Sequence, residues 1–257
     1  LKATAAGLAV TAGFPTVTFG AEDSRRLKVG LIGCGGRGTG AAQETLRRLA
    51  AAFSKVEPEI RIEVIEGLGS SGAIAAVAGG AIDFAISGRP LGANDSRALK
   101  GSVIARTPFC LASSHPQPGD VRSVDIADFI GSATSVWSDG KPVRLVLRPR
   151  SDSDSQLLVR YFPEMAAAMD KARQRSEIPV AATDRDNAML AENMAGSLTA
   201  ITFAQIQTEN PSLTLLSIDG VTPTLENFES GKYPYGKDLE LVVPSNAKPA
   251  LERFVAF

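Results

Sequence analysis

Five turns rich in glycine, serine, threonine and aspartate carry the polar groups of this sequence that are best suited to chemistry. Each turn follows an apolar, strand-like run and precedes a helix-like run. They are GCGGRGTG (33–40), GLGSSGAI (67–74), SGRPLG (87–92), RPRSDSDS (148–155) and ATDRDN (182–187). Where parallel strands end and helices begin, backbone N–H groups and helix dipoles favour anions. With the planar guanidinium of Arg148 added, the pattern predicts a pocket for a small oxyanion such as phosphate.

The first turn also fits a second chemistry. Gly33, Gly35 and Gly38 form a G-x-G-x-x-G pattern after an apolar run, which in dinucleotide-binding folds cradles a pyrophosphate. An acid at the end of the second strand would then hold the ribose, and Glu66 is the candidate. It lies well beyond the usual spacing of about 20 residues from the glycines. A nicotinamide-dependent oxidoreductase therefore stays an alternative.

Composition argues against several other functions. Among 257 residues the net charge is −1 and aromatic residues make up 6%, which gives no support for nucleic-acid binding. One histidine and two cysteines nearly exclude a zinc cluster. We expect Cys34 and Cys110 to be separate buried thiols. We expect His115 to lie in a solvated loop instead of acting as an acid or base.

Close aspartate pairs are the remaining candidates for metal or acid–base chemistry. They are Asp152 with Asp154 and Asp184 with Asp186. We expect helix caps or solvated loops at these positions, because no metal-ligand motif accompanies them. Neither a G-x-S-x-G elbow nor a Walker motif occurs. The sequence therefore predicts no catalytic residue, no metal and no cofactor.

The alternation of strand and helix patterns predicts the elements that position these turns. From Leu27 the order is strand, helix, strand, helix, strand, with short buried strands such as LKVGLIG and AIDFAIS. This order indicates an α/β fold with a largely parallel sheet. A second block of strands and helices begins near Arg106.

The first residues read differently from the rest. Residues 1–26 are rich in Ala, Gly and Thr, with Lys2 as the only charge before Glu22. This resembles the apolar region of an export signal, interrupted by Gly13 and Pro15. We expect a leader-like segment and an exported protein, with a disordered N-terminal arm as the alternative.

Four segments, in order, resemble the phosphate-binding-protein branch of the type II periplasmic solute-binding proteins, which are receptors of ABC-type transporters. The segments are EVIEGLGSSGAIAAVAGGAIDFAISGRPL (63–91), RLVLRPRSDSDS (144–155), PVAATDRDNAMLAENMAGSLTAITFAQI (179–206) and GKYPYGKDLELVVPS (231–245). The resemblance runs from about Arg47 to Phe257. It implies a two-lobed type II periplasmic binding protein fold with the ligand in the cleft between the lobes.

The resemblance also implies a partition of the chain and a set of contacts. Lobe one would comprise 27–105 plus 204–257, and lobe two 106–203. The family's ligand contacts fall on nine positions of this sequence: Gly38, Thr39, Ser70, Ser71, Ser87, Arg148, Ser151, Ser153 and Asp184. Reversible binding with hinge closure would follow, with no chemistry on the ligand.

Two positions depart from the family's pattern. Gly88 stands where members carry an acid directly after the serine of the S-x-x-P-L turn, and Arg150 where they carry an acid two residues after the arginine. In the family the first acid accepts a proton from the ligand. Its loss leaves selectivity between phosphate, sulfate-like and organic anions open. Asp152 or Asp154 could compensate.

A competing resemblance covers only the N-terminal 40 or so residues. AGFPTVTFGAEDSRRLKVGLIGCGGRGTGAA (12–42) resembles the start of exported oxidoreductases of the glucose-fructose oxidoreductase and inositol dehydrogenase type. The E-K-P motif of those enzymes is absent from the sequence. We therefore expect an exported, monomeric receptor that captures phosphate or a similar small oxyanion for an ABC transporter permease. The alternatives are the oxidoreductase and a degenerate, receptor-like sensor or scaffold that binds no ligand.

Overall fold

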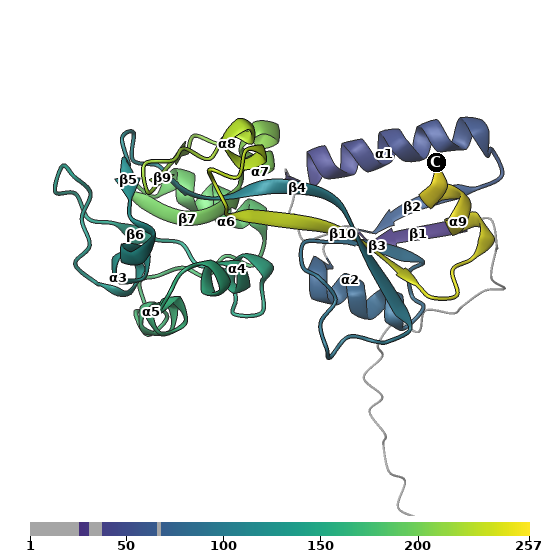
Figure 1. The fold of residues 1–257 in the computed structure, drawn as a ribbon, viewed down its shortest axis with the longest axis horizontal. Coiled ribbons are helices and arrows are strands. Elements are labelled where there is room, and N and C mark those ends of the chain that lie inside the picture. The colour runs from purple at the N-terminus through teal and green to yellow at the C-terminus, as the bar shows by residue number, and fades with distance from the viewer. Residues whose placement is uncertain (1–25, 31–37, 66–67) are drawn as a thin grey trace, which may run out of the picture.

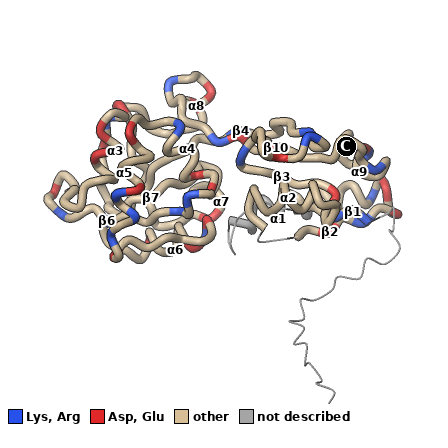
Figure 2. The backbone as a smooth tube through the Cα atoms, turned by 90° about the horizontal axis from the view of Figure 1, so that it is seen from below, with Lys and Arg blue, Asp and Glu red and all other residues tan. Residues whose placement is uncertain are grey.

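Two lobes joined by two long strands make up the computed structural model (Figure 1). The structure describes residues 26–30, 38–65 and 68–257. The long strands are β4 (Leu99–Ser113) and β10 (Gly236–Pro244), which lie side by side and run antiparallel from one lobe into the other. Figure 2 shows acidic and basic residues interspersed over both lobes, as the near-zero net charge predicts.

Lobe one contains the first α/β units. Besides parts of the two long strands, it contains β1 (Arg26–Gly30), α1 (Gly38–Val56), β2 (Arg61–Ile65), α2 (Gly69–Ala78), β3 (Phe84–Ser87) and α9 (Pro249–Ala256). Strand β1 pairs in parallel with β2 and β3. Leu27, Phe53, Phe84 and Phe254 are nearly fully buried in its core, with the ring of Phe53 edge-on to that of Phe254. Phe53 lies on the apolar face of α1, which packs against the core shared by the sheet and α9.

Lobe two holds most of the short elements. Its strands are β5 (Asp120–Val121), β6 (Arg144–Leu145), β7 (Ser197–Thr202), β8 (Thr214–Leu215) and β9 (Ser217–Ile218). Its helices are η1 (Ser123–Asp125), α3 (Ile126–Gly131), α4 (Ser153–Tyr161), α5 (Met165–Ala172), α6 (Asp184–Asn193), α7 (Phe203–Glu209) and α8 (Leu225–Glu229). Buried Phe109, Trp137, Met165 and Tyr233 belong to its core.

The main sheet is mixed, so the expectation of a largely parallel sheet is corrected. Its order is β2-β1-β3-β10-β4-β7-β6, with β8 on β4. Strand β10 runs antiparallel to both β3 and β4, and β7 and β8 run antiparallel to β4. The reason is topological: a chain that crosses between lobes once in each direction lays down two neighbouring strands of opposite sense.

The point at which the chain returns to lobe one determines how its residues are divided between the two lobes. Strand β8 pairs with the lobe-two end of β4, and β9 pairs with β5. Figure 1 shows α7 and α8 beside the other lobe-two elements. We therefore propose that the chain returns to lobe one along β10, instead of near Ala204 as the sequence analysis expects.

Candidate functional site

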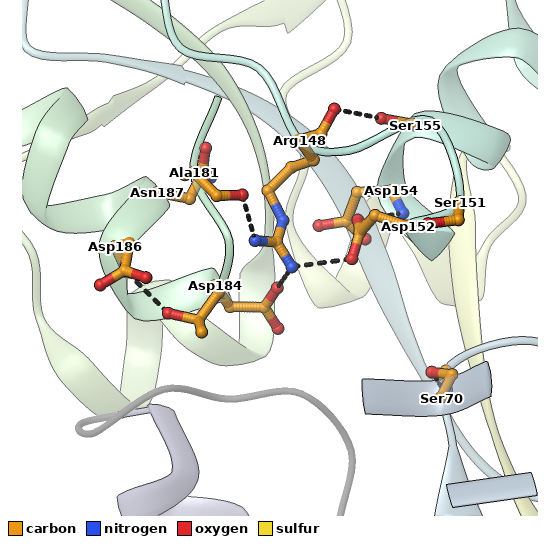
Figure 3. Close-up of polar contacts among 12 residues, drawn as sticks. Ser70, Arg148, Ser151, Asp152, Asp154, Ser155, Ala181, Asp184, Asp186 and Asn187 are labelled. Atoms are coloured by element: carbon orange, nitrogen blue, oxygen red, sulfur yellow. Dashed lines mark hydrogen bonds and ion pairs between the residues drawn. The ribbon is translucent and has the colours of Figure 1, made fainter. Parts of the chain in front are cut away.

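Arg148 is the centre of the polar cluster that the structure brings together (Figure 3). Its side chain is 4% exposed. Nη1 donates to the carbonyl of Ala181 at 2.7 Å, and Nη2 donates to carboxylate oxygens of Asp152 at 2.7 Å and Asp184 at 2.9 Å. Nε is buried without a partner among the described residues. The guanidinium is thus held rigidly, with one donor still to be satisfied.

Two helix N-termini supply the carboxylates around Arg148. Asp152 is the N-cap of α4, and its second oxygen accepts from the N–H of Asp154 at 2.9 Å. Asp184 is the first residue of α6, which is capped by the hydroxyl of Thr183. Carboxylates are favourable at the positive end of a helix dipole. The anion-favouring helix starts predicted from the sequence therefore already hold acids of the chain itself.

Lys237 is a second buried cation, and the sequence analysis missed it. It lies near the start of β10, is 5% exposed, and pairs through Nζ with a carboxylate oxygen of buried Asp154 at 2.5 Å. A Cβ added to Gly88 would lie 2.8 Å from Cε of Lys237. The space that an acid at position 88 would occupy is thus taken by a lysine stem. The sequence signal for Lys237 is its place within GKYPYGKDLELVVPS (231–245), the last of the four segments that carry the family resemblance.

The cluster is close to electrically balanced, with two cations and three carboxylates. Burial raises the pKa of Asp184 to about 7, with Asp154 and Asp152 adding to the rise while Lys237 and Arg148 oppose it. Burial lowers the pKa of Lys237, but Asp154 and Asp184 outweigh it and hold that pKa above the ordinary value. This raised pKa brings the charge change of Asp184 close to neutral pH.

Lobe one faces this cluster with a serine turn. The hydroxyl oxygen of Ser70, in the first turn of α2, accepts from the N–H of Gly88 at 3.0 Å. Figure 3 places Ser70 on α2, across from Asp152 and Ser151. A hydroxyl that accepts a backbone hydrogen bond keeps its own proton free to donate. Among the described residues of lobe one, Ser70 is thus the group best placed to bind an anion.

The other serines of the predicted set lie in differing surroundings. Ser71 accepts from Nε of Arg89, which also forms a two-point ion pair with Asp95. Ser87 is fully buried and bonds the backbone of Arg89. Ser151 is exposed, and Ser153 is buried at the start of α4.

The predicted anion-binding role of the glycine turn 33–40 falls mostly on residues outside the described ranges. Gly38 begins α1 and Thr39 follows it, but the Thr39 side chain and the loop 31–37 lie outside the described residues. Gly33, Gly35 and Cys34 belong to that loop, and Glu66 also lies outside the described ranges.

His115 is buried, which corrects the expectation of a solvated loop. It is 5% exposed, stacks on Trp137, and its Nε2 lies 3.0 Å from a carboxylate oxygen of Asp139. Nδ1 accepts from the N–H of Gln117, so Nε2 carries the proton and donates it. Cys110 is a buried free thiol, as expected.

The described ranges contain neither a metal-binding arrangement of side chains nor a helix suited to crossing a membrane. Within 26–30, 38–65 and 68–257 no group of histidine, cysteine and acidic side chains is arranged to hold a metal ion. In the same ranges no helix has the length and apolar character needed to cross a membrane.

Several solved structures have a fold similar to that of this chain. A structure from Clostridium perfringens, described as a phosphate ABC transporter substrate-binding protein with bound phosphate, has 18% identity and a TM-score of 0.73, covering 90% of this chain and 91% of that one. An ABC-type phosphate transport receptor from Vibrio cholerae has 15% identity and a TM-score of 0.62, covering 90% and 92%. The CcmR regulatory domain from Synechocystis in complex with 2-PG has 12% identity and a TM-score of 0.53, covering 90% and 94%.

No curated protein matches the sequence. At these identities the structural likeness shows the fold alone, and the first neighbours are two-lobed periplasmic binding proteins of type II. The family model described as the PBP superfamily domain matches residues 35–257. With the observed two-lobed α/β fold, this shows that the chain belongs to the PBP superfamily.

Proposed function

We propose that this protein is an exported receptor that captures phosphate or a similar small oxyanion and delivers it to the permease of an ABC transporter. The observation that carries the proposal is the pair of buried cations, Arg148 and Lys237, facing a serine turn of the other lobe. Two structural neighbours whose names include phosphate transport support it. The family resemblance supports reversible binding without chemistry.

An incoming oxyanion would compete with the carboxylate of Asp184. That carboxylate already accepts from Nη2 of Arg148, so a ligand that takes this position must displace it. The displacement is easier when Asp184 is protonated, because the neutral acid is a weaker acceptor. Nε of Arg148 and the hydroxyl of Ser70 are the further donors for the ligand. Capture of the anion is therefore coupled to the protonation of Asp184.

Isothermal titration calorimetry with phosphate, sulfate, molybdate and NAD tests the proposal. We expect an oxyanion to bind and NAD not to bind. Arg148→Ala should weaken binding by about 2 kcal/mol or more, because a buried charged hydrogen bond is lost. Arg144→Ala is the matched control, since Arg144 is an exposed arginine on β6 of the same lobe. NAD binding without oxyanion binding would refute the receptor and favour the oxidoreductase.

A receptor-like protein without a ligand is the second candidate. It is favoured by one observation: both buried cations already have carboxylate partners within the chain. If it holds, none of the three oxyanions binds at either acidic or neutral pH.

A further inference from the structure

A separate cavity lies on lobe two behind the turn that carries Arg148. Its volume is about 320 Å³, and it opens between α4 and α5. Three kinds of side chain line it. They are the charged Arg150, Asp170 and Arg173, the polar Ser155 and Gln156, and the apolar Val159, Ala166 and Met169.

The cavity is separate from the Arg148 cluster because it faces the opposite side of the same turn. The carbonyl oxygen of Arg148 accepts from Nη2 of Arg173 at 2.9 Å and from the hydroxyl of Ser155 at 3.1 Å. The guanidinium of Arg148 is directed instead toward Ala181 and Asp184. A ligand in the cavity would therefore contact the back of the turn and none of the donors assigned to the oxyanion.

The charges around the cavity do not balance. Arg150 forms an ion pair with Asp170, and Nη1 of Arg173 lies 4.0 Å from the same carboxylate. Two guanidinium groups thus share one acid, which leaves one positive charge. Burial of Arg173, whose side chain is 14% exposed, and repulsion from Arg150 both lower the pKa of its guanidinium. A bound monoanion would relieve this repulsion.

The rest of the lining is apolar and partly open to solvent. Val159 is 45% exposed, Ala166 is also exposed, and Met169, which is buried, completes the apolar lining. Apolar surface gathered beside cationic groups is suited to a ligand with a hydrocarbon part and a charged end. Guanidinium groups bind carboxylates in a planar, two-point geometry.

We propose that this cavity is a binding site for a small organic monocarboxylate, with its carboxylate on Arg150 and Arg173 and its hydrocarbon part on Val159, Ala166 and Met169. The site is independent of the proposed oxyanion site. Its ligand differs from an inorganic oxyanion in needing the apolar contact as well as the charge.

Titration of the full chain with hexanoate, followed by calorimetry and by amide chemical shifts in NMR, tests the proposal. We expect one hexanoate to bind, with shifts concentrated in residues 150–173. Hexanol lacks the charge and inorganic phosphate lacks the apolar part, so each should bind this cavity at least about tenfold more weakly than hexanoate.

Three variants locate the binding. Arg150→Gln should weaken hexanoate binding about tenfold, because a charged hydrogen-bond partner is lost. Val159→Glu places a negative charge on the exposed apolar wall and should abolish binding. Arg160→Gln, on the same helix but outside the cavity, should leave it unchanged. Equal binding by the wild type, Arg150→Gln and Val159→Glu, or hexanol binding as tight as hexanoate, would overturn the proposal.

Discussion

Asp184 is the residue whose protonation should control ligand capture. Its pKa of about 7 results chiefly from burial, and it shares the cluster with Arg148, Lys237, Asp152 and Asp154. Because this pKa is above the ordinary 3.8, the folded state holds the proton more tightly than the unfolded state does. The free energy of unfolding contributed by Asp184 should therefore fall as the pH rises from about 4 to about 7.

The same charge change should make oxyanion affinity depend on pH. Below about 7, Asp184 is neutral and releases Arg148 to the ligand, so we expect sulfate affinity to fall as the pH rises through this value. Sulfate is the probe because its own charge is constant there. In Asp184→Asn the side chain stays neutral, and calorimetry should give an affinity that is nearly independent of pH. A profile as steep as that of the wild type would show that another group titrates.

We expect the residue at position 88 to influence which charge state of the ligand is accepted. Gly88→Asp would place a carboxylate beside Lys237, whose flexible end lies where the new Cβ would go. We expect sulfate affinity to fall about tenfold, and phosphate affinity to fall less, because a protonated phosphate can donate to the new acid. Gly88→Asn is the control, since it has the same size without the charge. Equal losses for both anions in calorimetry, or the same losses in Gly88→Asn, would contradict this.

The sequence allowed the residue types of the site and their positions at helix starts to be predicted, but it did not show which residues pair with one another. The turns that hold Ser70, Arg148 and Asp184 were predicted as helix starts, and the structure has helices there. Pairing could not be predicted. Nothing in the local sequence shows that Lys237 meets Asp154, 83 positions away, because that contact depends on how the lobes are joined.

Among the elements, α6 depends on a single capping hydroxyl at the edge of the site. Thr183 accepts from the N–H of Asp186 at 3.1 Å, so Thr183→Ala should lower the free energy of unfolding by about 1 kcal/mol. Thr208→Ala is the matched control, because the exposed Thr208 lies within α7 and bonds the carbonyl of Ala204; that change should be neutral or slightly stabilising. Urea denaturation measures both. An equal fall in the free energy of unfolding for both variants would mean that the Thr183 cap does not stabilise α6.

Element prediction failed where a cap overrides strand propensity. SLTAITFAQI reads as one strand-rich segment, because Ile, Thr and Phe favour strands. The structure divides it into β7 and α7 at Thr202, whose hydroxyl accepts from the N–H of Gln205. The two-residue strand β5 also escapes prediction, because its pairing comes from tertiary contacts and it is too short to show any periodicity. Strands β8 and β9 fall within LTLLSIDG (213–220), which does read as strand-rich.

For the whole molecule, the crossing of the chain between lobes is the feature that the sequence pattern does not encode. Periodicity identifies β4 and β10 as strands, but their shared antiparallel register is a property of the topology. That register brings Lys237 of β10 beside both Gly88 of lobe one and Asp154 of lobe two. The Lys237–Asp154 pair therefore anchors the crossing strand β10 to α4 of lobe two, and the lysine stem beside Gly88 is its approach to lobe one.

Replacing one partner of the Lys237–Asp154 pair should lower the free energy of unfolding more than replacing both partners. Lys237→Met leaves the carboxylate of Asp154 buried and unpaired, and should lower the free energy of unfolding by about 3–5 kcal/mol. Adding Asp154→Leu removes the stranded charge and should restore most of the loss. The more exposed pair Arg106–Asp238, which joins β4 to β10, is the control, since Arg106→Met should cost at most about 1 kcal/mol. Urea denaturation followed by circular dichroism compares these variants. A double variant as unstable as Lys237→Met alone would show that packing of the lysine stem, and not the ion pair, supplies this stability.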